Sequence, residues 1–349
     1  MISNTNKKLL WQIPFLLFLA VGTVWIIRQH ATMPYKTCNG QIFGTTYSVT
    51  YQYEDDLQKA IEDELRKVDD ALSTFNKEST ISHINNNEAT APNEMFTEVF
   101  LLSKTISENT GGAFDITVAP LVNLWGFGFK NGEEPSQAKI DSIGTFVGYK
   151  KVNLLDTYRN AKAKSWIKKD DPRVMLDCSA IAKGYGVDVV ARLLRNFHVD
   201  NFMVEIGGEV VTSGVNPDKQ PWRVGIVKPS DNISNNGQEL QTILNISNKA
   251  MATSGNYRNF YYKDGQKYAH TIDPKTGRPV QHGLLSATVI ANNCATADAY
   301  ATAFMVMGVD KARKVLEKHP ELQAYFIFSD VNSNTQTWMS SAMQSYIKQ

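Results

Sequence analysis

Asp298 and Thr302 stand four residues apart in a stretch of small residues, 295–302, that predicts a helix. Residues at i and i+4 share one helix face, so the carboxylate and the hydroxyl would lie one turn apart. Oxygen ligands of this kind suit a hard cation such as Mg²⁺, which often completes its shell with water and phosphate. The local pattern alone favours an explanation without a metal, because Asp favours a helix start and Thr hydroxyls often bond within a helix.

A second candidate lies at residues 176–185, where a strand is expected to end and a helix to begin. Free backbone N–H groups at that point, together with Lys183, could hold a phosphate. The glycine spacing does not match a Walker loop. In the alternative interpretation Lys183 is solvated and Gly184 serves close packing.

His270 ends an expected strand and precedes a turn rich in proline and glycine, 271–279. Its imidazole could take a proton near neutral pH, although a hydrogen-bonded structural histidine fits equally well. Upstream, Thr253 and Ser254 offer hydroxyls, and Gly255 would let a ligand approach the backbone.

Two glycine-containing turns complete the candidates. In 205–209 a strand runs into two glycines, and either of its glutamates could orient a ligand; a tight turn is the alternative. In 111–117, Phe114 could stack on a planar ring and Asp115 could accept from ring N–H or ribose groups. A core position is the stronger local interpretation of Phe114.

Composition limits the class of protein that carries these residues. The chain has 349 residues, of which 42% are hydrophobic and 20% are charged, which is typical of a globular protein with one large domain or two. Lys plus Arg is 36 and Asp plus Glu is 35, so there is no basic excess that would indicate nucleic-acid binding. Three scattered cysteines are too few for a disulfide framework or a zinc site.

Hydrophobic periodicity predicts the elements that must position the candidates. Strands and helices alternate irregularly and include hairpins, which favours an α+β fold over a doubly wound parallel sheet. Strands are expected at 41–53, 174–177, 202–205, 222–227, 240–246, 259–262, 267–272, 285–291 and 324–329. Helices are expected at 54–75, 93–109, 182–197, 295–307 and 309–318.

The N-terminal segment is expected to be a membrane anchor. An apolar run, 9–27, follows Lys7 and Lys8, and as a helix it would reach about 28 Å, close to the thickness of a bilayer core. A cleaved signal peptide and a buried core helix are the alternatives. We therefore divide the chain into an anchor (or signal) and flank, 1–32, and a body, 33–349, facing the outside of the membrane.

Taken in series, these motifs resemble the ApbE family, whose members are FAD:protein FMN transferases. The resemblance covers the chain from about residue 41 to the end and implies a fold of two packed α+β subdomains with mixed or antiparallel sheets. The one transmembrane helix expected before it rests on the apolar run 9–27 and differs from the family, whose members are often lipoproteins. The motifs that carry it are 43–47, 112–117, 120–121, 125–128, 180–185, 205–209, 253–255, 270–279 and 297–298 with Thr302.

The resemblance implies Mg²⁺-dependent transfer of FMN from its substrate FAD to a Thr or Ser hydroxyl of a carrier protein, through a phosphoester bond and with release of AMP. The carriers would have an acceptor pattern like Asp-x-x-Ser/Thr-Gly-Ala-Thr, as in subunits of membrane redox pumps. The implied location is the bacterial inner membrane, with the catalytic domain on the periplasmic or extracytoplasmic side. The alternatives are an FAD pyrophosphatase giving FMN and AMP, and a non-catalytic membrane-anchored flavin-binding protein.

The resemblance also implies roles for individual residues. His270 matches the base for the acceptor hydroxyl, whereas Asp298, Thr302 and the backbone carbonyl of Ala180 match the metal ligands. Phe43 stands where many members have Met, and its apolar character would preserve packing on a ring. The residues matched to FAD binding are Phe43, Ala113, Phe114, Asp115, Lys183, Thr253, Ser254, Gly255, His270 and Ile272.

Overall fold

The computed structural model describes most of the catalytic body and a short part of the N-terminal segment. The described residues are 13–23, 33–126, 135–159, 162–229, 239–256, 260–263, 266–269, 271–332 and 334–347.

Residues 13–23 are helical, and the residues directly before and after them lie outside the described part of the chain. Within the described residues, no helix has the length and apolar character needed to cross a membrane. The expected transmembrane helix is therefore not found in this part of the chain, and the rest of the segment 9–27 lies outside the described residues.

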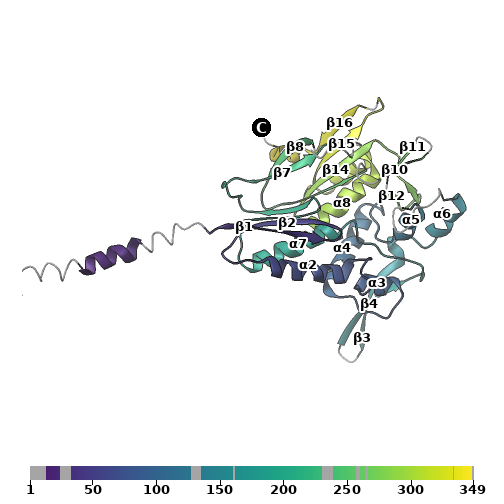
Figure 1. The fold of residues 1–349 in the computed structure, drawn as a ribbon. Coiled ribbons are helices and arrows are strands. Elements are labelled where there is room, and N and C mark those ends of the chain that lie inside the picture. The colour runs from purple at the N-terminus through teal and green to yellow at the C-terminus, as the bar shows by residue number, and fades with distance from the viewer. Residues whose placement is uncertain are drawn as a thin grey trace, which may run out of the picture.

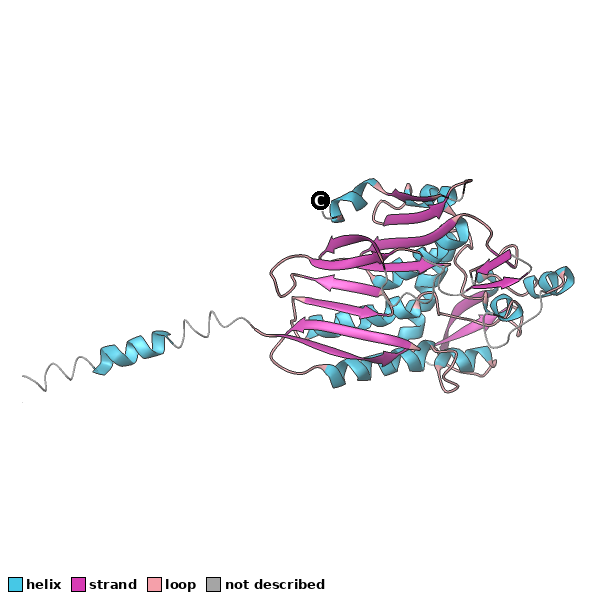
Figure 2. Cartoon of the chain, turned by 45° about the horizontal axis from the view of Figure 1, so that its top comes forward, coloured by secondary structure: helices cyan, strands magenta, loops and turns pink. Residues whose placement is uncertain are grey.

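One antiparallel sheet of eight strands runs through the body, with helices behind it in the view of Figure 2. The prediction of an α+β fold with antiparallel pairing is confirmed. The expected two subdomains share this one sheet, since its strands pair continuously from edge to edge. In spatial order, its strands are β1 (Tyr35–Ile42), β2 (Thr45–Gln52), β5 (Phe202–Ile206), β6 (Glu209–Ser213), β9 (Ala250–Gly255), β14 (Leu284–Ala291), β15 (Gln323–Ser329) and β16 (Thr335–Met339).

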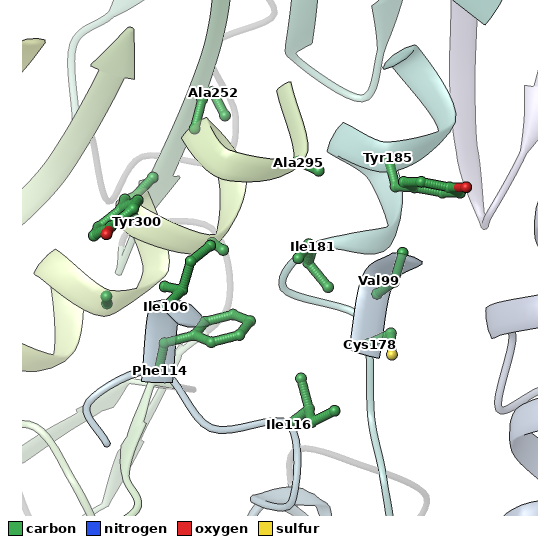
Figure 3. Close-up of a cluster of buried hydrophobic side chains, with 14 of the residues drawn as sticks. Val99, Ile106, Phe114, Ile116, Cys178, Ile181, Tyr185, Ala252, Ala295 and Tyr300 are labelled. Carbon is green, nitrogen blue, oxygen red and sulfur yellow. The ribbon is translucent and has the colours of Figure 1, made fainter. Parts of the chain in front are cut away.

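Helices cover one face of the sheet, and α7 (Ala182–Asn196) and α8 (Cys294–Met307) lie at its centre (Figure 1). Their apolar faces join the body's largest hydrophobic core, part of which Figure 3 shows around Phe114, Ile181 and Tyr300. The other helices are α2 (Gln58–Leu72), α3 (Thr80–Asn85), α4 (Glu94–Asn109), α5 (Ala119–Leu124), α6 (Gln137–Gly144), α9 (Val309–Leu316) and the 3₁₀ helices η1 (Tyr149–Lys151) and η2 (Ser341–Tyr346).

Two-stranded ribbons supply the rest of the secondary structure. The ribbon of β7 (Trp222–Val227) and β8 (Leu240–Ile246) contributes Ile226 and Leu244 to a second core, which also contains Met251 of β9. The other ribbons pair β3 (Val152–Arg159) with β4 (Lys162–Lys169), β10 (Phe260–Lys263) with β11 (Gln266–Ala269), and β12 (Ile272–Asp273) with β13 (Arg278–Pro279).

Two expectations for single strands are wrong. Residues 41–53 are not one strand, because Phe43 and Gly44 form a tight turn between β1 and β2, with φ of 51° and 71°. The usual Asn-Gly or Asp-Gly signal for such a turn is missing from the sequence. Residues 174–177 form no strand, because the Asn85 side chain occupies both the N–H and the C=O of Leu176, at 2.7 and 2.9 Å.

The N-terminus of α8 is fixed by a side chain of α7. Asp188 accepts hydrogen bonds from the backbone N–H groups of Cys294 and Ala295, both at 2.8 Å. Asn293 adds an N-cap, since its side chain accepts from the N–H of Thr296. These bonds set the position of α8 relative to α7 before any ligand is considered.

Asp188→Ala should lower the free energy of unfolding by about 1–3 kcal/mol, because two buried N–H groups lose their acceptor. Urea denaturation of the full-length protein measures this change. Asp310→Ala is the control, since Asp310 is an exposed acidic residue in the first turn of α9 and should change stability by less than about 0.5 kcal/mol. Equal stability of Asp188→Ala and wild type would contradict the capping role.

Candidate active site

A cavity of about 470 Å³ lies where the start of α7 and one face of α8 meet the end of β9 and the β1–β2 turn. Nearly all of the sequence-predicted site residues line it; His270 lies outside the described residues. Another cavity, of about 530 Å³, lies beside β4 and contains none of them. The predicted residues that line the first cavity are Phe43, Ala113, Phe114, Asp115, Ala180, Lys183, Thr253, Ser254, Gly255, Ile272, Asp298 and Thr302.

Helices α7 and α8 approach closely at Gly184, and this contact brings the expected metal ligands to one place. The Gly184 N–H donates to Asp298 Oδ2 at 3.0 Å. A Cβ at this glycine would lie 2.4 Å from the Cys294 carbonyl oxygen and 2.8 Å from the Asp298 Cβ. Only a glycine fits at this position. This agrees with the interpretation from the sequence that Gly184 serves close packing.

Three oxygen atoms on the cavity wall have no hydrogen-bond donor among the described residues and could take a ligand. Because the Gly184 N–H bonds to Asp298, the carbonyl of Ala180 lacks the partner that a continuing helix would give it. Thr302 makes no bond back to the helix within the described residues, and Oδ1 of Asp298 likewise has no protein donor there. One carboxylate, one hydroxyl and one carbonyl oxygen are hard ligands, so this donor set fits Mg²⁺.

This donor set differs from a site built of charged side chains. The described part of the chain contains no group of three His, Cys, Asp or Glu side chains that could hold a metal ion. A cation bound here would therefore depend on neutral oxygens, and on water or a phosphate ligand, for most of its shell.

Burial makes the electrostatics of the cavity unusual. The Asp298 side chain is only 4% exposed, and this burial raises the pKa of its carboxyl, against the opposing effects of Lys183 and the Gly184 N–H. Burial alone would lower the pKa of Lys183, but the neighbouring carboxylates of Asp298 and Glu209 outweigh it and raise that pKa. Lys183 is therefore a charged ammonium on the cavity wall, as a phosphate contact requires.

Glu209 is the third charged residue beside Asp298 and Lys183. The sequence did not distinguish it from Glu205, the other glutamate of the same turn. It begins β6, is 3% exposed and forms an ion pair with Lys183. Burial, with the charge of Asp298, raises the pKa of its carboxyl to about 7, although Lys183 opposes the shift. Glu205 instead accepts from the Gly208 N–H at 2.9 Å and does not line the cavity. The apolar pair Val210 and Val211, next to Glu209, is the signal that this acid would be buried.

Phe43 reaches the cavity from the β1–β2 turn, where it has a positive φ that is unusual for an aromatic residue. Its ring lies against α7, because a Cβ on Gly186 would be 2.7 Å from the ring. Such backbone strain is often found at binding sites, and this turn places the ring on the cavity wall.

Phe114 and Asp115 line the cavity but also have structural roles. Phe114 is 2% exposed and belongs to the hydrophobic core (Figure 3). Asp115 Oδ1 accepts from the backbone and hydroxyl of Thr117, and Oδ2 accepts from the Tyr149 N–H. Its carboxylate therefore ties its own loop to η1, and contact of either residue with FAD stays a prediction.

The opposite wall is formed by the end of β9 and by β12. The hydroxyl of Thr253 bonds to that of Thr288 across the sheet at 2.9 Å. The Thr271 hydroxyl donates to the side-chain oxygen of Asn256 at 2.6 Å, which ties the start of the β12 turn to the end of β9. His270 directly precedes Thr271 in the sequence.

Gly184→Ala should lower the free energy of unfolding by about 1–3 kcal/mol and abolish FAD binding, because the new methyl group would push α8 away from α7. Thermal denaturation and FAD titration measure the two effects. Gly144→Ala is the control: nothing lies within 4 Å of its Cβ position at the end of α6. A Gly184→Ala protein that binds FAD like wild type would show that the helix contact does not shape the site.

Comparison with known proteins places this geometry in a family. Residues 43–326 match the model of the ApbE family. The FAD:protein FMN transferase of Haemophilus influenzae is 38% identical over 307 residues, which are 84% of this chain and 86% of that protein. The FAD:protein FMN transferase of Escherichia coli K12 is 35% identical over 297 residues, covering 84% and 82% of the two chains.

Solved structures give the same result. The flavin transferase ApbE from Vibrio cholerae aligns with a TM-score of 0.76 and 34% identity, covering 90% of this chain and all of that one. The apo form of the Pseudomonas stutzeri flavinyl transferase ApbE aligns with a TM-score of 0.79 and 30% identity, covering 91% and 98%. The fold and the sequence agree: this chain is a member of the ApbE family.

Proposed function

We propose that this chain transfers FMN from FAD to a Thr or Ser hydroxyl of a carrier protein and releases AMP. The observation that carries the proposal is the cavity lined by Asp298, Thr302, Ala180 and the partly exposed, charged Lys183. The relatives named as FAD:protein FMN transferases support the same reaction.

Transfer of a phosphoryl group depends on positioning and charge neutralisation more than on covalent help from the protein. Lys183 offers one positive charge to the pyrophosphate of FAD. Asp298, Thr302 and the Ala180 carbonyl would hold Mg²⁺, which when bound supplies Lewis-acid stabilisation of charge on the phosphate. His270 is the proposed base, because the acceptor hydroxyl has too high a pKa to attack unaided at neutral pH.

The rest of the cavity would bind the flavin nucleotide. Its apolar wall, which includes Phe43, Ala113, Phe114 and Ile272, suits packing on a planar ring. The hydroxyls and backbone of Thr253, Ser254 and Gly255 suit the polar edge of the ligand, and Asp115 completes the proposed FAD contacts.

We also propose that residues 1–32 anchor the protein in the bacterial inner membrane, with the body on the periplasmic or extracytoplasmic side. The described helix over 13–23 supports this location, because its large apolar side chains are about half exposed or more. Lys7 and Lys8 precede the segment, as expected for an end that stays inside. Recovery of the full-length protein in the soluble fraction after cell lysis would contradict the anchor.

The test of the function combines the full-length protein with FAD, Mg²⁺ and a carrier domain bearing the acceptor Asp-x-x-Ser/Thr-Gly-Ala-Thr. Flavin fluorescence of the carrier on a denaturing gel, abolished by EDTA, is the expected result. Release of AMP without a fluorescent carrier would favour the pyrophosphatase. FAD binding without either product would favour a non-catalytic flavin-binding protein.

Two substitutions should separate the proposed roles. Asp298→Ala should abolish Mg²⁺-dependent transfer, because the cavity loses its charged metal ligand. His270→Ala should bind FAD as wild type does and reduce the transfer rate by about 10²- to 10⁴-fold, the usual contribution of a general base. FAD titration and the rate of carrier labelling measure the two effects, and full activity of both variants would refute the site assignment.

A further inference from the structure

Glu209 is the residue of the cavity that the proposed chemistry leaves without a task. It is almost completely buried, at 3% exposure, and one carboxylate oxygen accepts from the Lys183 ammonium. The other oxygen, Oε2, is buried without a hydrogen-bond partner in the described part of the protein. Burying a carboxylate costs desolvation free energy, which an ion pair and hydrogen bonds to both oxygens would offset. Among the described residues only one oxygen has a partner, so the position of Glu209 beside Lys183 needs an explanation.

Lys183 stands between two carboxylates and pairs with only one of them. Its ion pair is with Glu209, and Asp298 does not come within 4.0 Å of its ammonium, although the charge of Asp298 still raises the Lys183 pKa. The lysine stem passes the Gly207 turn, where a Cβ would lie 3.4 Å from the Lys183 Cδ and 2.9 Å from Thr45. The turn that carries Glu209 is therefore shaped around this side chain.

Without Glu209, the lysine would have a different partner. The ammonium sits on a flexible four-carbon stem, and its side chain is only partly exposed, so it is expected to turn to another nearby counter-charge. Asp298 is the other carboxylate that acts on it. An ammonium paired with Asp298 would occupy the oxygen that is otherwise free, and it would compete there with any divalent cation.

We propose that Glu209 is a positioning residue that holds Lys183 away from Asp298 and thereby keeps the Asp298 carboxylate open for Mg²⁺. The same ion pair aims the ammonium at the space where the phosphate of FAD would lie. Glu209 thus acts on the cation through Lys183, without being a ligand itself. The inference rests on the magnesium site of the proposed function.

Two other roles for Glu209 make different predictions. A direct metal ligand would lower cation affinity when it is replaced, whether or not Lys183 is present. A purely structural residue would change the melting temperature without changing cation affinity. Removing the lysine in the background of a Glu209 variant distinguishes all three, because only the proposed role is reversed by it.

The experiment measures binding of Mn²⁺, as a probe of the metal site, to the full-length protein without FAD by electron paramagnetic resonance. Glu209→Gln should weaken binding about tenfold, in the usual range for residues that orient metal ligands. Lys183→Met should bind at least as tightly as wild type, and the double variant should return to within about threefold of wild type. Glu205→Gln is the matched control and should bind as wild type does. Melting temperatures show that each variant is folded.

The possible outcomes each decide the question. A double variant as weak as Glu209→Gln would make Glu209 a ligand and overturn the proposal, as would unchanged affinity in Glu209→Gln. A large loss in Lys183→Met overturns it independently of how the Glu209 variant folds. If wild type binds no Mn²⁺, this inference and the proposed magnesium site both fail. If the Mn²⁺ pattern is as expected but wild type labels no carrier, the proposed transferase reaction fails and the role of Glu209 stands.

Discussion

The close contact between α7 and α8 at Gly184 determines the site. Because this residue has no side chain, the two helices approach until its N–H reaches the Asp298 carboxylate at 3.0 Å. That bond diverts the N–H from the Ala180 carbonyl, which therefore stays available on the cavity wall. A packing constraint between helices thus sets out the proposed oxygen ligands, and the cap from Asp188 to the start of α8 keeps them there.

The contact between α7 and α8 also determines which charged side chains lie together at the cavity. Asp298 and Glu209 are almost completely buried and Lys183 is partly exposed, and the three groups affect one another's pKa values. With all three ionised, the cluster carries one net negative charge in a poorly solvated place. Such an excess is costly alone and favourable beside a cation, which supports the proposed binding of a divalent ion and an anionic substrate.

The sequence predicted the antiparallel α+β fold and the helices α4, α7 and α8 with good accuracy, because their apolar spacing and end signals are local. It also identified, through family resemblance, residues from distant segments that now line one cavity, such as Phe43 and Asp298. The turn at Phe43 and the irregular segment at 174–177 could not be foreseen, since their conformations depend on α7 and on the Asn85 side chain. The single sheet shared across the body likewise depends on tertiary packing that no local pattern encodes.

The cavity is assembled from pieces that are far apart along the chain, from the β1–β2 turn near its beginning to α8 near its end. Contacts of such long sequence separation form late and slowly during folding, since each closes a large loop. A nascent chain in which α8 has not yet docked would have the lysine and the aromatic wall but no Asp298. Capacity to bind the nucleotide would therefore arise only when the last third of the chain is in place, so a partly folded protein could not sequester FAD.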